Sequence, residues 1–404
     1  MSYKSEYLQT LERRGYIHQL TDAAAIDTRA QKPGLAAYVG FDLTGPSLHI
    51  GHLMSIMMLR RLQQHGGKPI ALMGGGTTKV GDPSGKDTQR QLLDQAAIDA
   101  NKASIRQVFE RFLTFGDGPS DAIMADNAEW LEQLNYIDFL RDYGRHFSVN
   151  RMLTMDSVRL RLEREQPLSF LEFNYMVLQS YDFVELNRRY ACVMQMGGSD
   201  QWGNITQGVD LGRRVSGAEL YGLTTPLITN ADGSKMGKTA GGAVWLNREQ
   251  LPDWDYWQYW RNVDDRDVGK FLRLFTDMPD DEIARLEALQ GAEINDAKIA
   301  LANAATTLCR GAEAATAAEA TARATFAQGG AGEALPSFAI RAPTPLVDAL
   351  VLTGLAASKG EARRKIGENA VRIDGEPATD PNQPVTAPAK LSLGKKRHAL
   401  LTAG

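Results

Sequence analysis

The chain has 404 residues, 43% of them hydrophobic, which is enough to bury a core and to form more than one domain. A formal net charge of −4 excludes a uniformly basic nucleic-acid binder, so a polyanion must meet a local basic patch. The two cysteines, Cys192 and Cys309, lie far apart, which argues against a disulfide framework and favours a reducing compartment, the cytoplasm. We expect no signal peptide, no membrane span and no metal cluster.

A strand–helix–strand unit opens the chain's patterned part. Residues 37–43 (AYVGFDL) and 69–74 (PIALMG) are apolar runs typical of buried strands, and residues 50–65 between them are patterned as a helix. This order is typical of a crossover unit in a parallel sheet, whose ligands lie at the carboxyl ends of the strands. Further helices are predicted over 170–187 and 200–214, and a further strand over 244–246.

The chain changes character after residue 245. Residues 246–328 are rich in helix formers and end in an alanine-rich run, 311–328, which we expect to be helical without contributing a core. Glycines, prolines and small residues mark 329–342 as a linker. Residues 343–404 hold nine Lys or Arg against six Asp or Glu, a net charge of +3, as expected for an RNA-binding appendage.

Two histidines stand three positions apart in "SLHIGH". On a helix, His49 and His52 would project together from the first turn, where free backbone N–H groups and the helix dipole favour a phosphate. Gly51 between them leaves room for a flat ring against the backbone. This pattern predicts a nucleotide triphosphate site, with two surface or capping histidines as the alternative.

A second cationic segment, "GSKMGKT", places Lys235 and Lys238 among small residues. Two flexible ammonium groups on a mobile loop suit a phosphate-rich transition state, which needs charge that closes over it after binding. A solvated charged turn is the alternative when the segment is taken by itself.

Together with these two segments, "GDPSGK", "FNYMVLQSYDF" and "MGGSDQWGNI" make the chain resemble the bacterial tyrosyl-tRNA synthetases of class I. The resemblance covers roughly residues 30–245, and the tail is similar to the family's RNA-binding module. Leu43 stands where many relatives carry proline, and Gly237 and Thr239 replace serines of the commonest second signature. The resemblance implies an α/β fold: a Rossmann-like parallel-sheet catalytic domain over 1–245, an α-helical domain over 246–328, and a small α+β RNA-binding domain over 343–404.

Tyr175, Gln179 and Asp182 fall at i, i+4 and i+7, so one stripe of an otherwise apolar helix carries a phenol, an amide and a carboxylate. Such a stripe faces water or lines a cavity. The resemblance implies a tyrosine pocket in which Tyr38 and Asp182 hold the substrate's phenolic hydroxyl. Its ammonium group is expected on Tyr175, Gln179 and Asp82, with Gln195 on the rim.

The implied reaction is attack of the tyrosine carboxylate on the α-phosphate of ATP, followed by transfer of the tyrosyl group to the terminal adenosine of tRNA. A carboxylate is ionised at pH 7 and needs no base, so positioning and charge supply the catalysis. Mg²⁺ would accompany ATP without a dedicated protein site. The catalytic residues are predicted to be Thr44, His49, His52, Lys86, Arg90, Lys235 and Lys238. Further ATP contacts are predicted at Gly40, Asp42, Gly51, Gly198, Asp200, Gln201 and Met236.

A basic helix followed by a turn and a strand is predicted in the tail, and a solvated helical face is its alternative. The tRNA contacts are predicted at Lys359, Arg363, Arg364, Lys365 and Arg372. The family implies a homodimer, for which residues 135–153 supply a plausible contact helix. Three other functions compete: a tryptophan-specific synthetase, a small-molecule nucleotidylyltransferase, and a catalytically silent RNA-binding protein.

Overall fold

The computed structural model describes residues 3–84, 93–234, 236–239, 242–327, 335–394 and 397–404. The chain divides into two compact units. The first holds Met1–Gly237, Trp245–Gln250 and Gly269–Ile283, and the second holds Lys238–Val244, Leu251–Val268 and Ala284–Gly404.

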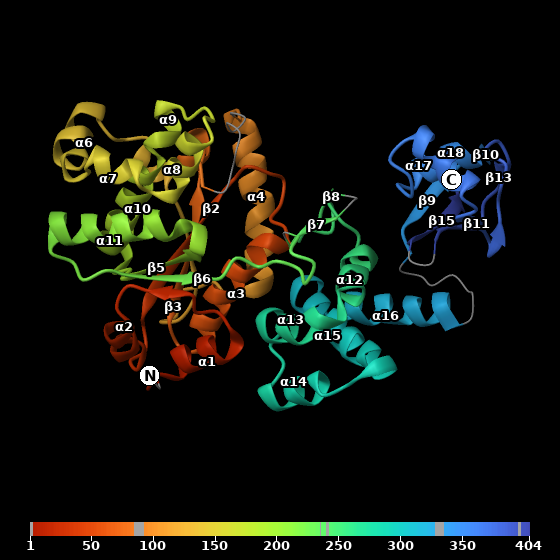
Figure 1. Ribbon diagram of the computed structural model, residues 1–404, viewed down its shortest axis with the longest axis horizontal. Helices are drawn as coiled ribbons and strands as arrows, with labels where there is room; N and C mark the ends of the chain where they lie inside the picture. Colours follow the sequence, from red (N-terminus) through yellow and green to blue (C-terminus); the bar gives the residue numbers. More distant parts are fainter. Residues whose placement is uncertain (1–2, 85–92, 235, 240–241, 328–334, 395–396) are drawn as a thin grey trace. The chain divides into compact units, whose positions relative to one another are not determined.

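A six-stranded sheet forms the centre of the first unit (Figure 1). Its strand order is β1-β6-β5-β2-β3-β4; β1 pairs antiparallel with β6 and all other pairs are parallel. The strands are β1 (Gln19–Leu20), β2 (Ala36–Asp42), β3 (Lys68–Gly74), β4 (Ile123–Asp126), β5 (Met194–Gly198) and β6 (Tyr221–Thr225). The expected strands over 37–43 and 69–74 are β2, displaced by one residue, and β3, which begins one residue earlier and ends where expected. The predicted α/β fold with a parallel sheet is confirmed.

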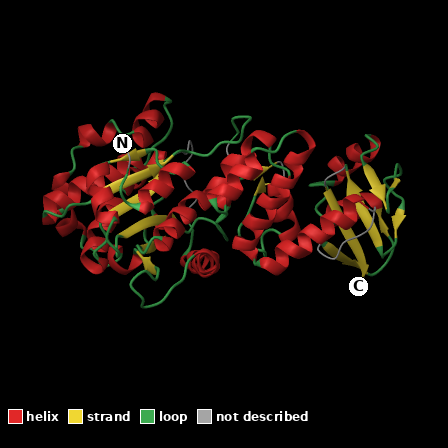
Figure 2. Cartoon of the chain, turned by 90° about the horizontal axis from the view of Figure 1, so that it is seen from below, coloured by secondary structure: helices red, strands yellow, loops and turns green. Residues whose placement is uncertain are grey.

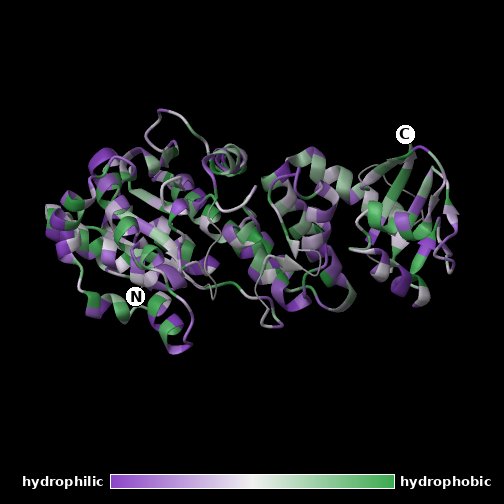
Figure 3. Ribbon diagram, turned by 90° about the horizontal axis from the view of Figure 1, so that it is seen from above, coloured by the Kyte–Doolittle hydropathy of each residue, from purple (hydrophilic) through white to green (hydrophobic). Residues whose placement is uncertain are grey.

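Helices lie on both sides of this sheet (Figure 2). The crossover from β2 to β3 is helix α3 (Ile50–Gln64), as the sequence predicts, and Leu53, Ile56 and Met57 are among its buried side chains. Hydrophobic and hydrophilic residues are interspersed along the helices (Figure 3), while α10 is buried all round over residues 180–186. The other helices are α1 (Glu6–Arg14), α2 (Ala23–Ala30), α4 (Gln95–Phe112), α5 (Ala128–Leu131), α6 (Tyr136–Asp142), α7 (Val149–Leu153), α8 (Asp156–Glu163), α9 (Phe170–Phe173), α10 (Tyr175–Tyr190) and α11 (Trp202–Ser216).

Two expected elements differ. The helix predicted over 170–187 is broken at Asn174 into α9 and α10. Ser169 and Glu172 cap the start of α9 reciprocally. The strand over 244–246 is absent from the described structure. Trp245 forms only an isolated bridge to His49, so this segment is tied to the start of α3 instead of joining a sheet.

The strand order reverses between β2 and β5. From β2 the chain proceeds to β3 and β4 on one side, and it returns to β5 and β6 on the other side. In open parallel sheets such a switch point leaves a crevice at the carboxyl ends of the two strands. Asp42 ends β2 and Gly198 ends β5, so the crevice lies where the first nucleotide signature and the glycine-rich segment meet.

In the second unit, α12 (Asp253–Arg261), α15 (Ile294–Arg310) and α16 (Ala312–Ala327) pack together. The expectation that the alanine-rich run contributes no core is wrong. Ala315, Ala318 and Ala322 lie along one face of α16 and are buried, because small side chains let α16 approach α15 closely. Two short helices, α13 (Val268–Phe275) and α14 (Asp280–Glu287), lie between α12 and α15 in the chain.

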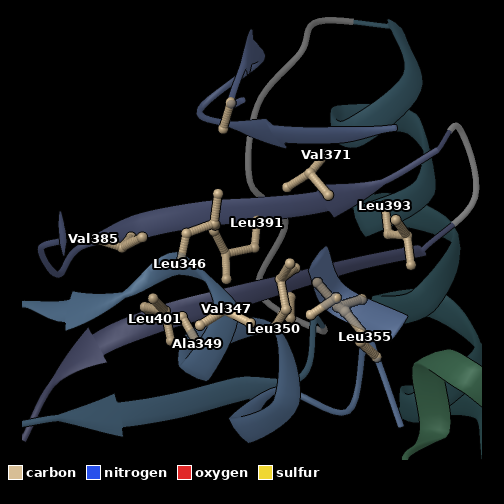
Figure 4. Packing of buried hydrophobic residues seen from close by; sticks show 14 of the residues in the cluster. Leu346, Val347, Ala349, Leu350, Leu355, Val371, Val385, Leu391, Leu393 and Leu401 are labelled. Atoms are coloured by element: carbon tan, nitrogen blue, oxygen red, sulfur yellow. The ribbon is translucent and has the colours of Figure 1, made fainter. Parts of the chain in front are cut away.

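The last residues form an α+β fold with its own core. Its five-stranded sheet has the order β12-β11-β14-β15-β9, and α17 (Leu346–Leu352) and α18 (Lys359–Gly367) pack with it. The strands are β9 (Ser337–Ile340), β11 (Val371–Ile373), β12 (Glu376–Pro377), β14 (Ala389–Leu393) and β15 (Arg397–Ala403). Leu346, Leu350, Leu391 and Leu401 meet in the core between helices and sheet (Figure 4). In the described residues no helix is long and apolar enough to span a membrane.

Candidate active site

The turn after β2 carries the first nucleotide signature. Asp42 is half-buried, and Thr44 is exposed two residues further along. Gly40 is exposed within a strand that is otherwise largely buried, and a side chain there would point into open space. The backbone N–H of Leu43 donates to Thr78 Oγ1 at 2.7 Å, a contact that a proline at this position would have no proton to make. Thr78 therefore accommodates the departure at Leu43.

His49 and His52 cap α3. His49 is the N-cap residue just before the helix, and its Nδ1 accepts from the N–H of Gly51 at 3.0 Å. His52 Nδ1 accepts from the N–H of His49 at 3.2 Å. The alternative role as capping residues is therefore real, but it does not exclude a phosphate site. Because each Nδ1 accepts, the proton of each neutral imidazole lies on Nε2, and both rings present an N–H donor.

The second signature lies against the first. The carbonyl oxygen of Met236 is 3.7 Å from the position that a Cβ atom on Gly51 would take. Gly237 has a φ angle of 93°, and a Cβ there would lie 3.0 Å from Gly51 N and 3.3 Å from His49 Nδ1. A glycine at 237 thus permits backbone contact with the start of α3. Lys86, Arg90 and Lys235 lie outside the described residues, as does the side chain of Lys238.

At the most deeply buried end of the site, Asp182 is 2% exposed and accepts two hydrogen bonds. Asn127 Nδ2 donates to its Oδ2 at 3.0 Å, and Trp130 Nε1 donates to its Oδ1 at 2.7 Å. Burial raises the pKa of Asp182 to about 7, against the effect of these two donors. Tyr38 is 1% exposed, and its hydroxyl has no hydrogen-bond partner within the described part of the chain. Burial and then the nearby Asp182 raise the pKa of the Tyr38 phenol well above its usual value.

At the other end, Tyr175 OH donates to the carboxylate of Asp42, 3.2 Å from each oxygen. Since its proton is directed at Asp42, the phenol presents a lone pair to a cation. Burial, followed by the charges of Asp42, Asp82 and Asp182, raises the pKa of Tyr175 well above its usual value. Carboxylates therefore surround this end of the pocket, which suits an ammonium group.

The amides beside Asp82 form a connected set. Gln201 Nε2 donates to Asp82 Oδ2 at 3.0 Å, and Gln179 Nε2 donates to Gln201 Oε1 at 3.3 Å. Asn204 Nδ2 donates to Gln179 Oε1 at 2.9 Å. These contacts bring Gln179 and Asp82, both predicted for the ammonium group, together with Gln201, which was predicted for ATP, and they fix which way each amide faces.

The end of β5 supplies the remaining predicted residues. Gln195 is 2% exposed, and its Oε1 lacks a partner among the described groups. Gly198 is half-buried and Asp200 is exposed, on the short helix that follows β5. The Asp200 Oδ1 atom is so close to Gly198 that a Cβ there would lie 2.6 Å from it.

Four residues were missed by sequence reasoning: Thr77, Asn127, Trp130 and Asn204. Each is buried and hydrogen-bonds a predicted site residue. A signal did exist for Asn127, because polar residues at the carboxyl end of a parallel strand lie at the ligand edge.

The predicted RNA-binding residues lie in the last domain. Lys359 to Lys365 are on α18, where Lys359 pairs with Asp348 at 2.6 Å and Lys365 pairs with Glu368 at 2.7 Å. Arg363, Arg364 and Arg372 are exposed. The turn after β11 lies at Asp374 and Gly375, with φ angles of 49° and 91°.

A parallel sheet with these signatures at its switch point is the architecture of a class I tRNA synthetase. The family described as "tRNA synthetases class I (W and Y)" matches residues 30–327, and the "Tyrosine--tRNA ligase SYY-like C-terminal domain" matches residues 326–400.

Curated relatives show to which family of class I tRNA synthetases the chain belongs. The tyrosine–tRNA ligase of Novosphingobium aromaticivorans is 63% identical over 99% of this chain and 98% of its own length, and that of Methylocella silvestris is 60% identical over 98% of each. A solved structure, the C-terminally truncated mitochondrial tyrosyl-tRNA synthetase of Coccidioides posadasii, has a TM-score of 0.68 and 31% identity, covering 78% of this chain and 91% of that one. The chain belongs to the tyrosine–tRNA ligases, and the tryptophan-specific alternative is not supported.

Proposed function

We propose that the crevice between β2 and β5 activates L-tyrosine with ATP and then transfers the tyrosyl group to the terminal adenosine of tRNA. The observation that supports this most directly is that the two ends of the site differ in chemistry. The buried Tyr38 hydroxyl and Asp182 carboxylate suit a phenolic hydroxyl, and the carboxylate-rich end around Tyr175 suits an ammonium group. An amino acid with a hydroxylated ring satisfies both ends.

At the hydroxyl end, the substrate's O–H donates to Asp182 and accepts from Tyr38. Phenylalanine makes neither bond and leaves both groups unpaired when it fills the pocket. A site built to hydrogen-bond a substrate hydroxyl rejects the analogue without it; tyrosyl-tRNA synthetases are the well-known example, with discrimination of about five orders of magnitude. Trp130 and Asn127 hold Asp182 for this task.

At the ammonium end, Asp82, Gln179 and Tyr175 each present an oxygen to the substrate's cation. The tyrosine carboxylate then faces the turn after β2, where ATP lies with its phosphates at the start of α3. The carboxylate oxygen forms a bond to the α-phosphorus as the bond to the bridging oxygen breaks, and pyrophosphate leaves. ATP enters as its magnesium complex, which belongs to the substrate.

His49 and His52 stabilise the charge that develops on the phosphates, because capping leaves both Nε2–H groups as donors. Thr44 joins them, and we retain Lys86, Arg90, Lys235 and Lys238 as predicted cations. Gly40, Asp42, Gly51, Gly198, Asp200, Gln201 and Met236 are proposed to contact ATP, and Gln195 to line the tyrosine side. Transition-state donors affect the chemical step more than ground-state binding.

Isotope exchange between ATP and pyrophosphate tests this proposal, with tyrosine, tryptophan and pantoate compared in parallel. Only tyrosine should support exchange. His49→Ala should slow adenylate formation and leave tyrosine affinity nearly unchanged, while His18→Ala, at an exposed histidine of the same unit, serves as the matched control. Equal loss of tyrosine affinity in His49→Ala would count against the phosphate role.

For tRNA, the proposed surface is the basic face of α18 with Arg372. Arg363 and Arg364 are exposed side by side on this helix, available to phosphates of the RNA backbone. The double substitution Arg363→Glu and Arg364→Glu should weaken tRNA charging and spare pyrophosphate exchange. Unchanged charging at limiting tRNA and raised salt would contradict it.

We also propose a homodimer that forms through α6 to α9. This region, which includes the predicted 135–153, exposes several large apolar side chains: Tyr136, Ile137, Val149 and Phe170 are 58 to 70% exposed. Such a patch marks an interaction surface. Ile137→Asp should shift sedimentation to the monomer, whereas Leu352→Asp in the last domain should not. The proposed compartment is the cytoplasm, in keeping with two buried cysteines that form no disulfide.

A further inference from the structure

A chain of hydrogen bonds joins the two ends of the site. It runs from Asp182 through Asn127 and Thr77 to Asp42. Asn127 and Thr77 are each 1% exposed, so the two residues in the middle of the chain are shielded from solvent. Neither residue belongs to the signatures that carry the family resemblance.

The direction of every bond in this chain is determined. Asn127 Oδ1 accepts from the backbone N–H of Gly76 at 2.8 Å, which fixes the orientation of its amide. Its Nδ2 group then donates to Asp182 Oδ2 and to Thr77 Oγ1, each at 3.0 Å. Since the Thr77 hydroxyl accepts from Asn127, its single proton is directed at Asp42 Oδ1, 2.9 Å away.

Thr77 is held in place by its surroundings. It begins a short 3-10 helix directly after β3, and the next residue, Thr78, binds the backbone of Leu43. Gly74, at the end of β3, leaves room for the Thr77–Asp42 contact. A Cβ atom on Gly74 would lie 2.5 Å from Asp42 Oδ1 and 2.6 Å from Thr77 Oγ1. The missing side chain at Gly74 therefore leaves space for the hydrogen bond between Thr77 and Asp42.

Asp42 connects this chain of hydrogen bonds to Tyr175. The same Oδ1 atom that accepts from Thr77 also accepts from the Tyr175 hydroxyl at 3.2 Å. The Asn127 amide and the Thr77 hydroxyl thus connect Asp182, proposed to recognise the substrate's phenol, to Asp42, which orients the Tyr175 hydroxyl.

We propose that Thr77 is a positioning residue that couples recognition of the tyrosine hydroxyl at Asp182 to the orientation of Asp42 and Tyr175. This inference rests on the proposed roles of those three residues. Without the Thr77 hydroxyl, one N–H of Asn127 loses its acceptor and Asp42 loses a donor. Asn127 then turns toward other acceptors, its bond to Asp182 weakens, and discrimination between tyrosine and phenylalanine falls together with the rate of adenylation.

The test compares Thr77→Val with Thr77→Ser. Valine keeps the shape and removes the hydroxyl, while serine keeps the hydroxyl. In pyrophosphate exchange, Thr77→Val should lower kcat/KM for tyrosine by about 5- to 30-fold and lower the tyrosine-to-phenylalanine ratio by about 5-fold or more, the loss expected when one or two buried hydrogen bonds are broken. Thr77→Ser should stay within about 3-fold of the unmodified enzyme for both quantities.

A double-substitution cycle separates positioning from a merely structural role. In an Asn127→Ala background, Thr77→Val should no longer change the tyrosine-to-phenylalanine ratio, because the route to Asp182 is already cut. If Thr77→Val lowers activity with both amino acids equally, or has the same effect on the ratio with and without Asn127, the proposal is overturned.

Gly74→Ala serves as a second perturbation should Thr77→Val fold poorly, since it crowds the same contact from β3. It should lower the ratio as Thr77→Val does, and an unchanged ratio would argue against the coupling. Asp182→Ala tests the underlying site separately. Intact discrimination in that variant would overturn the assignment of the hydroxyl pocket, whatever Thr77 does.

Discussion

Removing the hydroxyl of Tyr38 separates substrate recognition from stability. This hydroxyl is buried and has no partner among the described residues, so Tyr38→Phe breaks no protein hydrogen bond found there. The ring keeps its edge contact with Phe183, whose centroid is 5.3 Å away. The free energy of unfolding should therefore stay the same or rise by up to about 1 kcal/mol.

Substrate binding should change in the opposite direction. Tyr38→Phe loses one hydrogen bond to the substrate's hydroxyl, worth about 0.5 to 1.5 kcal/mol, so kcat/KM for tyrosine should fall by about 2- to 13-fold. The value for phenylalanine should stay within about 2-fold, because phenylalanine never made that bond. The ratio of kcat/KM for tyrosine to kcat/KM for phenylalanine therefore falls by the same factor as kcat/KM for tyrosine.

The measurements are thermal unfolding without substrate and pyrophosphate exchange with both amino acids. Asp182→Asn is the contrasting variant, because its amide directs an N–H toward either Asn127 or Trp130, which are both donors. It should lose about 1 to 3 kcal/mol of stability. A destabilised Tyr38→Phe enzyme with unaltered discrimination would refute the reasoning.

Three further outcomes follow from the same structure. Because burial raises the pKa of Asp182 to about 7 from 3.8 in the unfolded chain, its contribution to stability is present below pH 3.8 and lost as pH rises to 7. The carboxylate that binds tyrosine forms over the same upper range, so kcat/KM for tyrosine should rise from about pH 6 to 8, and a flat pH profile would contradict this. Thr78→Val leaves the buried N–H of Leu43 unpaired and should lower the free energy of unfolding, measured with denaturant, by about 1 to 3 kcal/mol. In a Leu43→Pro background, which has no N–H at this position, Thr78→Val should not cause this loss. Arg61→Met removes a buried guanidinium that bonds Asp277 at 2.6 Å, so about 1.5 to 3 kcal/mol of stability should be lost; no change in the denaturation midpoint would show that the pair contributes nothing.

Local patterns predicted much of the fold. The apolar runs at 37–43 and 69–74 are β2 and β3, and the helix between them begins at Ile50 as its periodicity indicates. The prediction that the alanine-rich run contributes no core was wrong, because alanine side chains on the buried and the exposed face of a helix look alike in the sequence. Its burial in α16 depends on how closely α15 approaches.

Some features of the candidate site could also be predicted from local sequence patterns, and others could not. Tyr175, Gln179 and Asp182 share one helix face, and helical periodicity alone predicts that they lie together. His49 and His52 are also neighbours by spacing, but the N-cap position of His49, and with it the Nε2–H tautomer, came from backbone hydrogen bonds that spacing does not reveal.

The amino-acid sequence by itself determined the signatures, the crossover unit and the polar stripe of α10, because these depend on contacts within a few residues. Only the tertiary structure decided that Asn127 and Trp130 hold Asp182 from more than 50 positions away, and that Thr77 lies between Asn127 and Asp42. The physical reason is parallel strand pairing. It places the carboxyl ends of β2, β3 and β4 at one edge of the sheet, where side chains distant in sequence come into hydrogen-bonding contact.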